Sequence, residues 1–175
     1  MSARVELLLL DLTEWRMLGD EPAVFAERRD LRLGDQAGTL REVGAATAAF
    51  LARIGDGAKW WPWWGCFLAM DPESRLVVGT CAFKGPPDAD EAVEIAYFTF
   101  PVYEGRGYAT AMAALLTSRA GAAPPARTVR AHTLPERNAS VRILEKLGFA
   151  HLGEVVDPED GPVWRWERVP GSSPS

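Results

Sequence analysis

The sequence predicts a mixed α/β (α+β) domain with a central, mostly antiparallel sheet of about seven strands, flanked by about four helices. Short apolar runs of strand length recur along the chain, and two of them flank a tight turn, which is typical of a hairpin. After the hairpin, strand-like and helix-like segments alternate. With 175 residues, 47% of them hydrophobic, the chain is long enough for one compact core. We therefore expect a single domain over residues 1–170 and a mobile polar tail over residues 171–175.

The first third of the chain predicts one strand and two helical segments. Residues 5–10 form an apolar run of strand length, and residues 13–29 contain one or two helical turns. A long amphipathic helix follows, because apolar residues recur there at steps of three and four. Its buried stripe consists of Leu40, Val43, Thr47, Phe50, Leu51 and Ile54. Gly55 supplies a stop.

A tryptophan-rich segment, residues 59–65, separates this helix from the hairpin. Pro62 in its middle is expected to break any regular element. Residues 66–70 and 76–84 then form the hairpin strands, and residues 92–100 form a third strand. Alternation along this third strand puts Glu94, Ala96, Phe98 and Phe100 on one face, with Ile95, Tyr97 and Thr99 on the other.

The second half of the chain alternates helices and strands. Helices are predicted over residues 108–119 and 140–147, and strands over residues 128–133, 149–156 and 163–168. Asn138 is suited to cap the start of the second of these helices, and Gly148 is suited to follow its end.

Composition excludes several classes of function. The net charge of -5 argues against nucleic acid as a partner, because phosphate binding needs clustered Lys and Arg; it suits a cationic amine substrate. The longest aliphatic run, residues 5–10, is too short to span a bilayer, so we expect a cytoplasmic protein with no membrane partner. Two histidines and no CxxC spacing predict no bound metal. Cys66 and Cys81 are expected to be small buried hydrophobes rather than a disulfide.

The most informative segment is a glycine turn at residues 104–110, which joins a strand to a helix. The first turn of a helix presents unpaired backbone N–H groups and a partial positive charge, which together attract an anion. Gly105 and Gly107 let the backbone approach a phosphate closely, while Arg106 and Thr110 add a charge and a hydroxyl. The segment predicts a phosphate or pyrophosphate site, with a plain strand-to-helix turn as the alternative.

Two nucleotide-binding motifs do not fit this turn. A Walker loop requires a Lys-Ser/Thr pair after its last glycine, and none follows here. The dinucleotide fingerprint requires a third Gly or Ala where this chain has Thr110, and the hairpin-first strand order fits a Rossmann sheet poorly. The hypothesis of a nicotinamide or flavin enzyme therefore rests on the glycines alone.

Three segments together resemble the GCN5-related N-acetyltransferase (GNAT) superfamily, and within it the branch of the ribosomal-protein N-terminal acetyltransferases. They are residues 94–97 (EIAY), 104–110 (EGRGYAT) and 138–149 (NASVRILEKLGF). The resemblance covers residues 76–149, and the order of the elements extends it to nearly the whole chain. It implies a GNAT-like fold and an enzyme that transfers acetyl from acetyl-CoA directly to a primary amine of a small molecule or a peptide N-terminus. Relatives often form homodimers.

The resemblance also implies which residues hold the co-substrate acetyl-CoA. The backbone amides of Phe98, Thr99 and Phe100 would bind the pantetheine arm, and Asn138 would lie near the cofactor. The pyrophosphate would be held by Gly105, Arg106, Gly107, Tyr108, Ala109 and Thr110. This chain departs from the family at two positions. Glu104 stands where the family has Gln or Arg, and Arg137 stands where this branch has the Asn that here comes one place later.

Acetyl transfer requires a neutral amine and a place for its proton, because free amines are largely protonated at neutral pH. Glu94 is the candidate base and also a candidate for contact with the acceptor, with Glu91 and His132 as alternatives. Ser140 is the candidate proton donor to the leaving thiolate, because Leu144 stands where many relatives have a tyrosine. A solvated carboxylate is the alternative role for Glu94, and hydrogen bonding at the helix start is the alternative for Ser140.

The tryptophans of the segment 59–65 suggest an aromatic wall for the acceptor. Trp63 and Trp64 are the candidates for substrate contact, and packing in the core is the alternative. A second functional hypothesis is a non-catalytic acyl-CoA-binding or sensory domain of the same fold. It arises because Glu104 and Leu144 remove groups that the family uses.

Overall fold

The structure is a computed structural model that describes residues 3–170, apart from the side chains of residues 56–58. The expected tail at residues 171–175 lies outside the described residues. A seven-stranded sheet with the order β1-β2-β3-β4-β5-β7-β6 forms its centre. The strands are β1 (Glu6–Leu9), β2 (Cys66–Asp71), β3 (Leu76–Phe83), β4 (Ala92–Thr99), β5 (Thr128–Thr133), β6 (Ala150–Asp157) and β7 (Gly161–Arg168). Only β4 and β5 pair in parallel, so the predicted mixed, mostly antiparallel sheet is confirmed.

The described residues form six α-helices rather than about four. They are α1 (Leu12–Asp20), α2 (Pro22–Arg29), α3 (Ala37–Ile54), α4 (Trp61–Trp64), α5 (Tyr108–Gly121) and α6 (Ala139–Lys146). The first segment is divided in two, because Asp11 caps α1 through a capping box with Glu14 and Pro22 starts a new helix. The expectation that Pro62 breaks regular structure is wrong: it lies in the first turn of α4, where the N–H it lacks has no helical partner.

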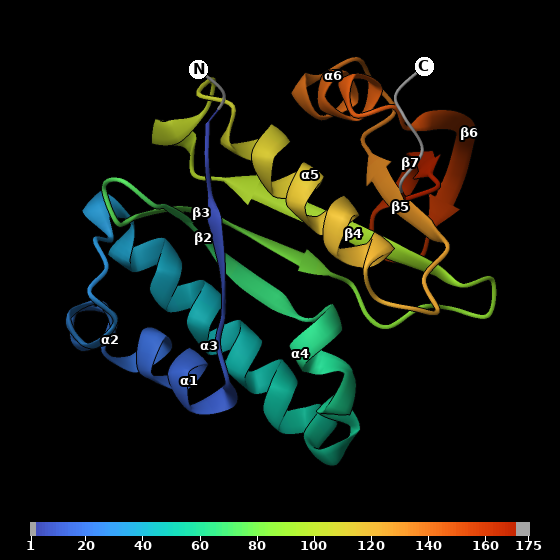
Figure 1. Ribbon diagram of the computed structural model, residues 1–175. Helices are drawn as coiled ribbons and strands as arrows, with labels where there is room; N and C mark the ends of the chain where they lie inside the picture. The colour runs from blue at the N-terminus through green and yellow to red at the C-terminus, as the bar shows by residue number, and fades with distance from the viewer. Residues whose placement is uncertain (1–2, 171–175) are drawn as a thin grey trace.

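The helices cover the two faces of the sheet in separate layers (Figure 1). On one face α1, α2 and α3 pack on β2 and its neighbours, with Trp15, Phe25 and Leu40 buried against Leu68 and Met70. On the other face α5 packs against the neighbouring residues of the same strands, through side chains such as Met112 and Leu116. Each face thereby has its own apolar core. None of the helices in residues 3–170 is long and apolar enough to cross a bilayer.

The sheet opens between β4 and β5. These strands pair only from Ala92 to Glu94, although β4 continues to Thr99. On its other side, β4 stays paired with β3 as far as the Gly79–Thr99 pair. In an antiparallel pair, successive residues of a strand direct their backbone N–H and C=O groups alternately toward and away from the partner strand. Phe100 directs its N–H toward β3, where it donates to the Val78 carbonyl at 3.0 Å. The backbone groups of Tyr97 and Thr99 consequently point away from β3, toward the gap.

Candidate active site

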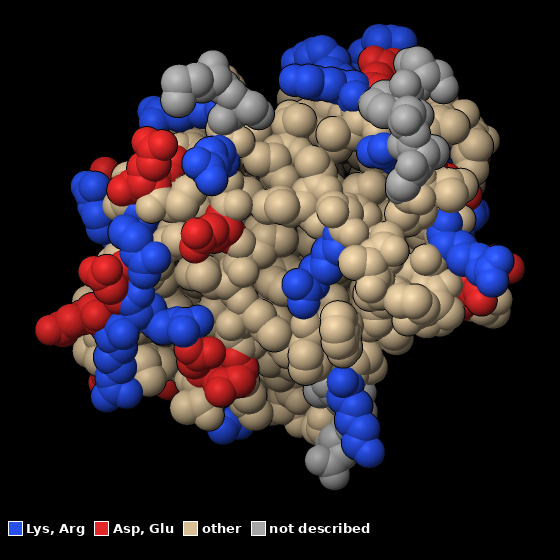
Figure 2. Space-filling model, viewed as in Figure 1, with Lys and Arg blue, Asp and Glu red and all other residues tan. Residues whose placement is uncertain are grey.

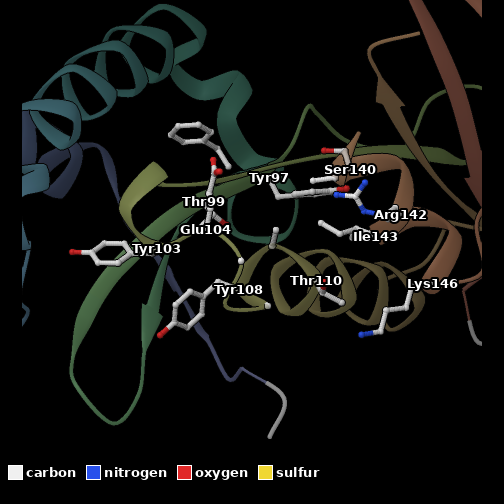
Figure 3. A pocket seen from close by; sticks show the side chains of 15 residues that line it. Tyr97, Thr99, Tyr103, Glu104, Tyr108, Thr110, Ser140, Arg142, Ile143 and Lys146 are labelled. Atoms are coloured by element: carbon white, nitrogen blue, oxygen red, sulfur yellow. The ribbon is translucent and has the colours of Figure 1, made fainter. Parts of the chain in front are cut away.

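A cavity of about 440 Å³ lies at this gap, between the end of β4, the glycine turn, α5 and α6 (Figure 3). It contains most of the residues that the sequence assigned to the cofactor. Its lining is Tyr97, Phe98, Thr99, Tyr103, Glu104, Gly105, Gly107, Tyr108, Ala109, Thr110, Ala139, Ser140, Arg142, Ile143 and Lys146. Phe100, Arg106 and Asn138 are predicted cofactor residues that do not line it. We call this space the cofactor cavity.

The glycine turn presents the start of α5 to the cofactor cavity. Gly105 and Gly107 have φ angles of 72° and 87°, a left-handed conformation that side chains with a Cβ rarely adopt. Gly107 is the N-cap of α5 and no side chain hydrogen-bonds the first N–H groups of the helix. The N–H groups of Tyr108, Ala109 and Thr110 therefore face the cavity without a side-chain cap, which suits an anion such as a phosphate.

Thr99 lies where the two strands part, and its hydroxyl suits a ligand. Its side chain is 8% exposed, and Oγ1 has no hydrogen-bond partner among the described residues. A buried hydroxyl without a partner is costly, so a group from a bound molecule would stabilise it. The amide of Thr99 also points into the gap. Thr99 thus fits the expected role in binding a pantetheine arm.

The structure does not bring all of the expected amides to the gap. Phe100 is fully buried and its N–H is bonded to Val78, and Phe98 belongs to the same hydrogen-bonded set facing β3. The expectation for these two amides therefore needs correction, because neighbouring residues of a strand direct their N–H groups to opposite sides. The side chain of Phe98, 49% exposed, still lines the cofactor cavity.

Basic side chains on α6 were missed by the sequence analysis. Arg142 and Lys146, one turn apart, both line the cofactor cavity. Neither has an ion-pair partner within residues 3–170, and Figure 2 shows Lys and Arg side chains gathered over α6. Arg106, by contrast, lies over the Tyr103 ring and donates to the Val102 carbonyl at 3.4 Å. The basic side chains that line this cavity come from α6.

Asn138 and Glu104, two residues that the sequence analysis singled out, lie at different places around the site. Asn138 is the N-cap of α6, where its Oδ1 accepts a hydrogen bond from Val141 N–H at 3.1 Å, as the sequence predicted. The same bond fixes the helix that carries Ser140 and Arg142. Glu104 does line the cofactor cavity, so its carboxylate lies on the same wall as the start of α5.

A second cavity, of about 330 Å³, contains Glu94. We call it the acceptor cavity; its polar residues include Lys84, Glu94, His132, Ser140 and Asp160. The carboxylate of Glu94 is 2.8 Å from Lys84 Nζ and 3.2 Å from His132 Nδ1. Asp157 and Asp160 lie 3.9 Å from His132 and Lys84, respectively. Glu94 and its alternative His132 therefore form one hydrogen-bonded group instead of two separate sites.

Electrostatics around this group favour a cation. Burial alone would lower the pKa of Lys84, but its hydrogen bond to Glu94 and the charges of Glu94, Asp157 and Asp160 outweigh this and raise the pKa. Backbone N–H groups of Asp160 and Glu159 hold the pKa of Asp157 below its usual value. The cavity thus places the carboxylates of Glu94 and Asp160 around one lysine, with Asp157 nearby, and this excess of acidic groups suits a positively charged amine.

Tyr97 and Ser140 line both cavities. Figure 3 shows the ring of Tyr97 reaching from β4 toward Ser140 on α6. Burial raises the pKa of Tyr97 to about 12, partly offset by the Ser140 hydroxyl, so the phenol holds its proton at neutral pH. The sequence analysis did not single out Tyr97, because the alternation pattern put Tyr97 on the opposite face of the strand from Glu94.

Several other candidates lie outside these cavities. Trp63 is 57% exposed, and Trp64 is buried edge-on against Phe83 at 5.0 Å; neither lines the acceptor cavity. The assignment of these two tryptophans to the substrate is therefore not supported by their positions. Glu91 pairs with Arg127 at the surface. Leu144 and the two cysteines, which are free, lie partly or fully within the core.

No cluster of three or more metal-binding side chains occurs among the residues described.

The chain matches the model of the acetyltransferase (GNAT) domain over residues 11–150, most of its length. It therefore belongs to the GNAT acetyltransferase family. The resemblance of the three sequence segments to the GNAT superfamily is thereby confirmed, together with the predicted class of enzyme, an N-acetyltransferase. No curated protein matches the sequence significantly.

Solved structures share the fold at low sequence identity. The ribosomal-protein-S5-alanine acetyltransferase from Vibrio fischeri has a TM-score of 0.68 and 12% identity, covering 98% of this chain and 96% of that one. A dodecameric spermidine N-acetyltransferase from Vibrio cholerae has a TM-score of 0.64 and 13% identity, with 95% and 94% covered. A ribosomal L7/L12 α-N-protein acetyltransferase in complex with coenzyme A has a TM-score of 0.63 and 16% identity, with 96% and 95% covered.

Proposed function

We propose that the protein is an acetyl-CoA-dependent N-acetyltransferase that acts on a primary amine of a small molecule or a peptide N-terminus. One observation carries the proposal: the cofactor cavity and the acidic acceptor cavity meet at Tyr97 and Ser140, where β4 and β5 part. A donor bound on one side and an amine bound on the other would have their reacting atoms at this junction.

The residues present fit acetyl-CoA, which supplies the acetyl group as a thioester. The first N–H groups of α5 would hold its pyrophosphate, Arg142 and Lys146 would add charge, and Thr99 would bind the pantetheine arm. Glu94 would take the proton that the amine loses, directly or through a water molecule, as the new C–N bond forms. The Tyr97–Ser140 pair would donate a proton to the thiolate sulfur when the C–S bond breaks.

Thermal denaturation with acetyl-CoA, CoA and NADH, each at saturating concentration, tests the cofactor cavity. A ligand at 100 times its Kd adds about 2.7 kcal/mol to the free energy of unfolding, a rise in Tm of roughly 5–10 °C for a domain of this size. Acetyl-CoA and CoA should both produce this rise and NADH should leave Tm unchanged. A rise with NADH alone would restore the nicotinamide hypothesis.

Tyr97→Phe tests the proton donor. Because Ser140 remains, the variant should lower kcat by about 10- to 100-fold, less than the full loss of an acid catalyst. The KM for acetyl-CoA should stay within about twofold, since the ring is kept. Tyr103→Phe, which removes a hydroxyl elsewhere in the cofactor cavity, is the matched control and should keep its kcat. Equal losses in both variants would show that the Tyr97 hydroxyl has no special role.

A non-catalytic acyl-CoA-binding domain is the second candidate, and the contact between Lys84 Nζ and Glu94 favours it. Oε1 of this carboxylate already contacts Lys84 Nζ at 2.8 Å and His132 Nδ1 at 3.2 Å, so proton transfer from a substrate would fall to Oε2. The two functions separate in one assay, CoA release in the presence of a broad amine panel. An acetyltransferase turns over repeatedly, whereas a sensory domain binds acetyl-CoA with no amine-dependent release.

A further inference from the structure

A third cavity, of about 460 Å³, adjoins the acceptor cavity and is lined by aromatic rings. We call it the aromatic cavity. Phe50 of α3 and Trp60 both pack against Trp61, with ring centroids 6.3 and 5.9 Å apart. Neither Phe50 nor Trp60 is fully buried, so both rings offer surface to a ligand. Stacking against such rings favours a flat apolar group.

The floor between the two cavities consists of small side chains. Cys66 lies opposite Ala82, and Ala82 lies opposite Ala96, so the three form one row across β2, β3 and β4 on one face of the sheet. Cys66 and Ala82 line the aromatic cavity, and Ala96 lines the acceptor cavity. Burial raises the pKa of the Cys66 thiol to about 12, so the floor carries no charge at neutral pH.

Among the described residues, the charged side chains that line the aromatic cavity are those of Lys84 and Glu159. Lys84 lines both cavities. In the turn between β6 and β7, Asp157 Oδ1 accepts hydrogen bonds from the backbone N–H groups of Glu159 and Asp160. Through this turn, Glu159 borders the aromatic cavity and Asp160 borders the acceptor cavity. An occupant spanning the two cavities therefore has its apolar part at Phe50 and Trp60 and its cationic end at Glu94.

We propose that the aromatic cavity binds the body of the acceptor, and that the acceptor is a small primary amine carried on a short aliphatic arm from an aromatic ring. This inference rests on the proposed acetyltransferase function. A linear polyamine needs carboxylates along its length, and the aromatic cavity supplies one, Glu159, at its rim. A peptide needs partners for its backbone N–H and C=O groups, and four of the lining residues are aromatic, with ring faces that offer none to it.

The experiment compares kcat/KM for four probes: phenylethylamine, propylamine, spermidine and an alanine tetrapeptide. Phenylethylamine should exceed propylamine, which keeps the amine and the arm and lacks the ring, by about 10-fold or more. Failure to acetylate any probe, with acetyl-CoA still bound, would count against the acetyltransferase function itself. Acetylation of spermidine or of the tetrapeptide in preference to phenylethylamine would leave that function intact and overturn the aromatic acceptor.

Trp60→Ala locates the preference in the aromatic cavity. It should lower kcat/KM for phenylethylamine about 10-fold, mostly through KM, and leave propylamine within about twofold. Trp63→Ala is the matched control, because Trp63 is 57% exposed and lines none of the three cavities described here. Equal losses for both amines in Trp60→Ala, or equal effects of the two variants, would overturn the proposal.

A second variant keeps the test valid if Trp60→Ala does not fold. Ala82→Leu adds a branched side chain to the half-buried floor without removing a ring. It should reduce turnover of phenylethylamine and spare propylamine, while circular dichroism and Tm report that the fold is kept. Unchanged turnover of phenylethylamine in a folded Ala82→Leu variant would show that its ring does not cross this floor.

Discussion

Replacing Glu94 by Gln should lower kcat for acetyl transfer by one to three orders of magnitude. Glu94 lies near the start of β4 and lines the acceptor cavity. Its side chain is 19% exposed, and its carboxylate contacts Lys84 and His132. General acid–base catalysis contributes about 10²–10⁴-fold, and water in the cavity would replace part of the lost function. Glutamine keeps the shape and the hydrogen-bond acceptor but cannot take a proton from the amine. The measurement is kcat at saturating acetyl-CoA and amine.

The contacts of Glu94 call for a control, because the substitution also removes half of its ion pair with Lys84. Asp160→Asn removes another carboxylate near Lys84, at 3.9 Å, and leaves Glu94 in place. It should change KM for a cationic amine modestly and spare kcat. If the two variants lose kcat equally, the loss reports the charge of the cavity.

The local patterns in the sequence were sufficient for most of the fold. The first four strands are short apolar runs between turn residues, and the stripe through Leu40 and Leu51 marks α3 correctly, because both side chains are buried. Helix starts depend on single side chains and were harder to predict. The capping box of Asp11 with Glu14 and the restart at Pro22 divide a segment whose hydrophobic pattern alone does not show a break.

The opening between β4 and β5 was beyond local patterns. It depends on where β4 stops pairing with β5, which is after the pair formed by Glu94 and Arg130, two residues far apart in the sequence. Without that geometry, the amide of Thr99 looks equivalent to that of Phe100, whereas one faces the gap and the other is bonded to Val78. The same gap places Tyr97, a residue of β4, where it lines both cavities.

The tryptophan segment shows a related limit. Composition indicated an aromatic wall but not which rings form it, because the answer depends on the short helix α4 and its orientation. The tryptophans that line the aromatic cavity are Trp60 and Trp61, while Trp64 turns into the core. A signal for Arg142 and Lys146 was available: basic residues four apart on a helix share a face, and the sequence already predicted a phosphate site nearby at the glycine turn.

Gly107→Val should abolish detectable binding of acetyl-CoA at concentrations that saturate the wild type. Gly107 has φ 87° and ψ 2° as the N-cap of α5, and a β-branched residue in that conformation costs about 1–3 kcal/mol. The sequence suggested a direct clash with phosphate. The structure indicates a different cause, because the nearest atom to an added Cβ would be Ala3 Cβ, at an ordinary contact distance of 3.4 Å. The strain would instead displace the turn that orients the N–H groups of Tyr108, Ala109 and Thr110.

Because strain also lowers stability, loss of binding must be separated from loss of fold. Gly153→Val places the same side chain at a glycine with φ 107° on β6, where an added Cβ has open space and the cofactor cavity is not involved. Both variants should lower Tm, but only Gly107→Val should lose the rise in Tm and the calorimetric binding of acetyl-CoA. Normal affinity in a folded Gly107→Val variant would mean that the backbone of this turn does not hold the pyrophosphate. The basic pair on α6, Arg142 and Lys146, would then be the remaining candidates for that role.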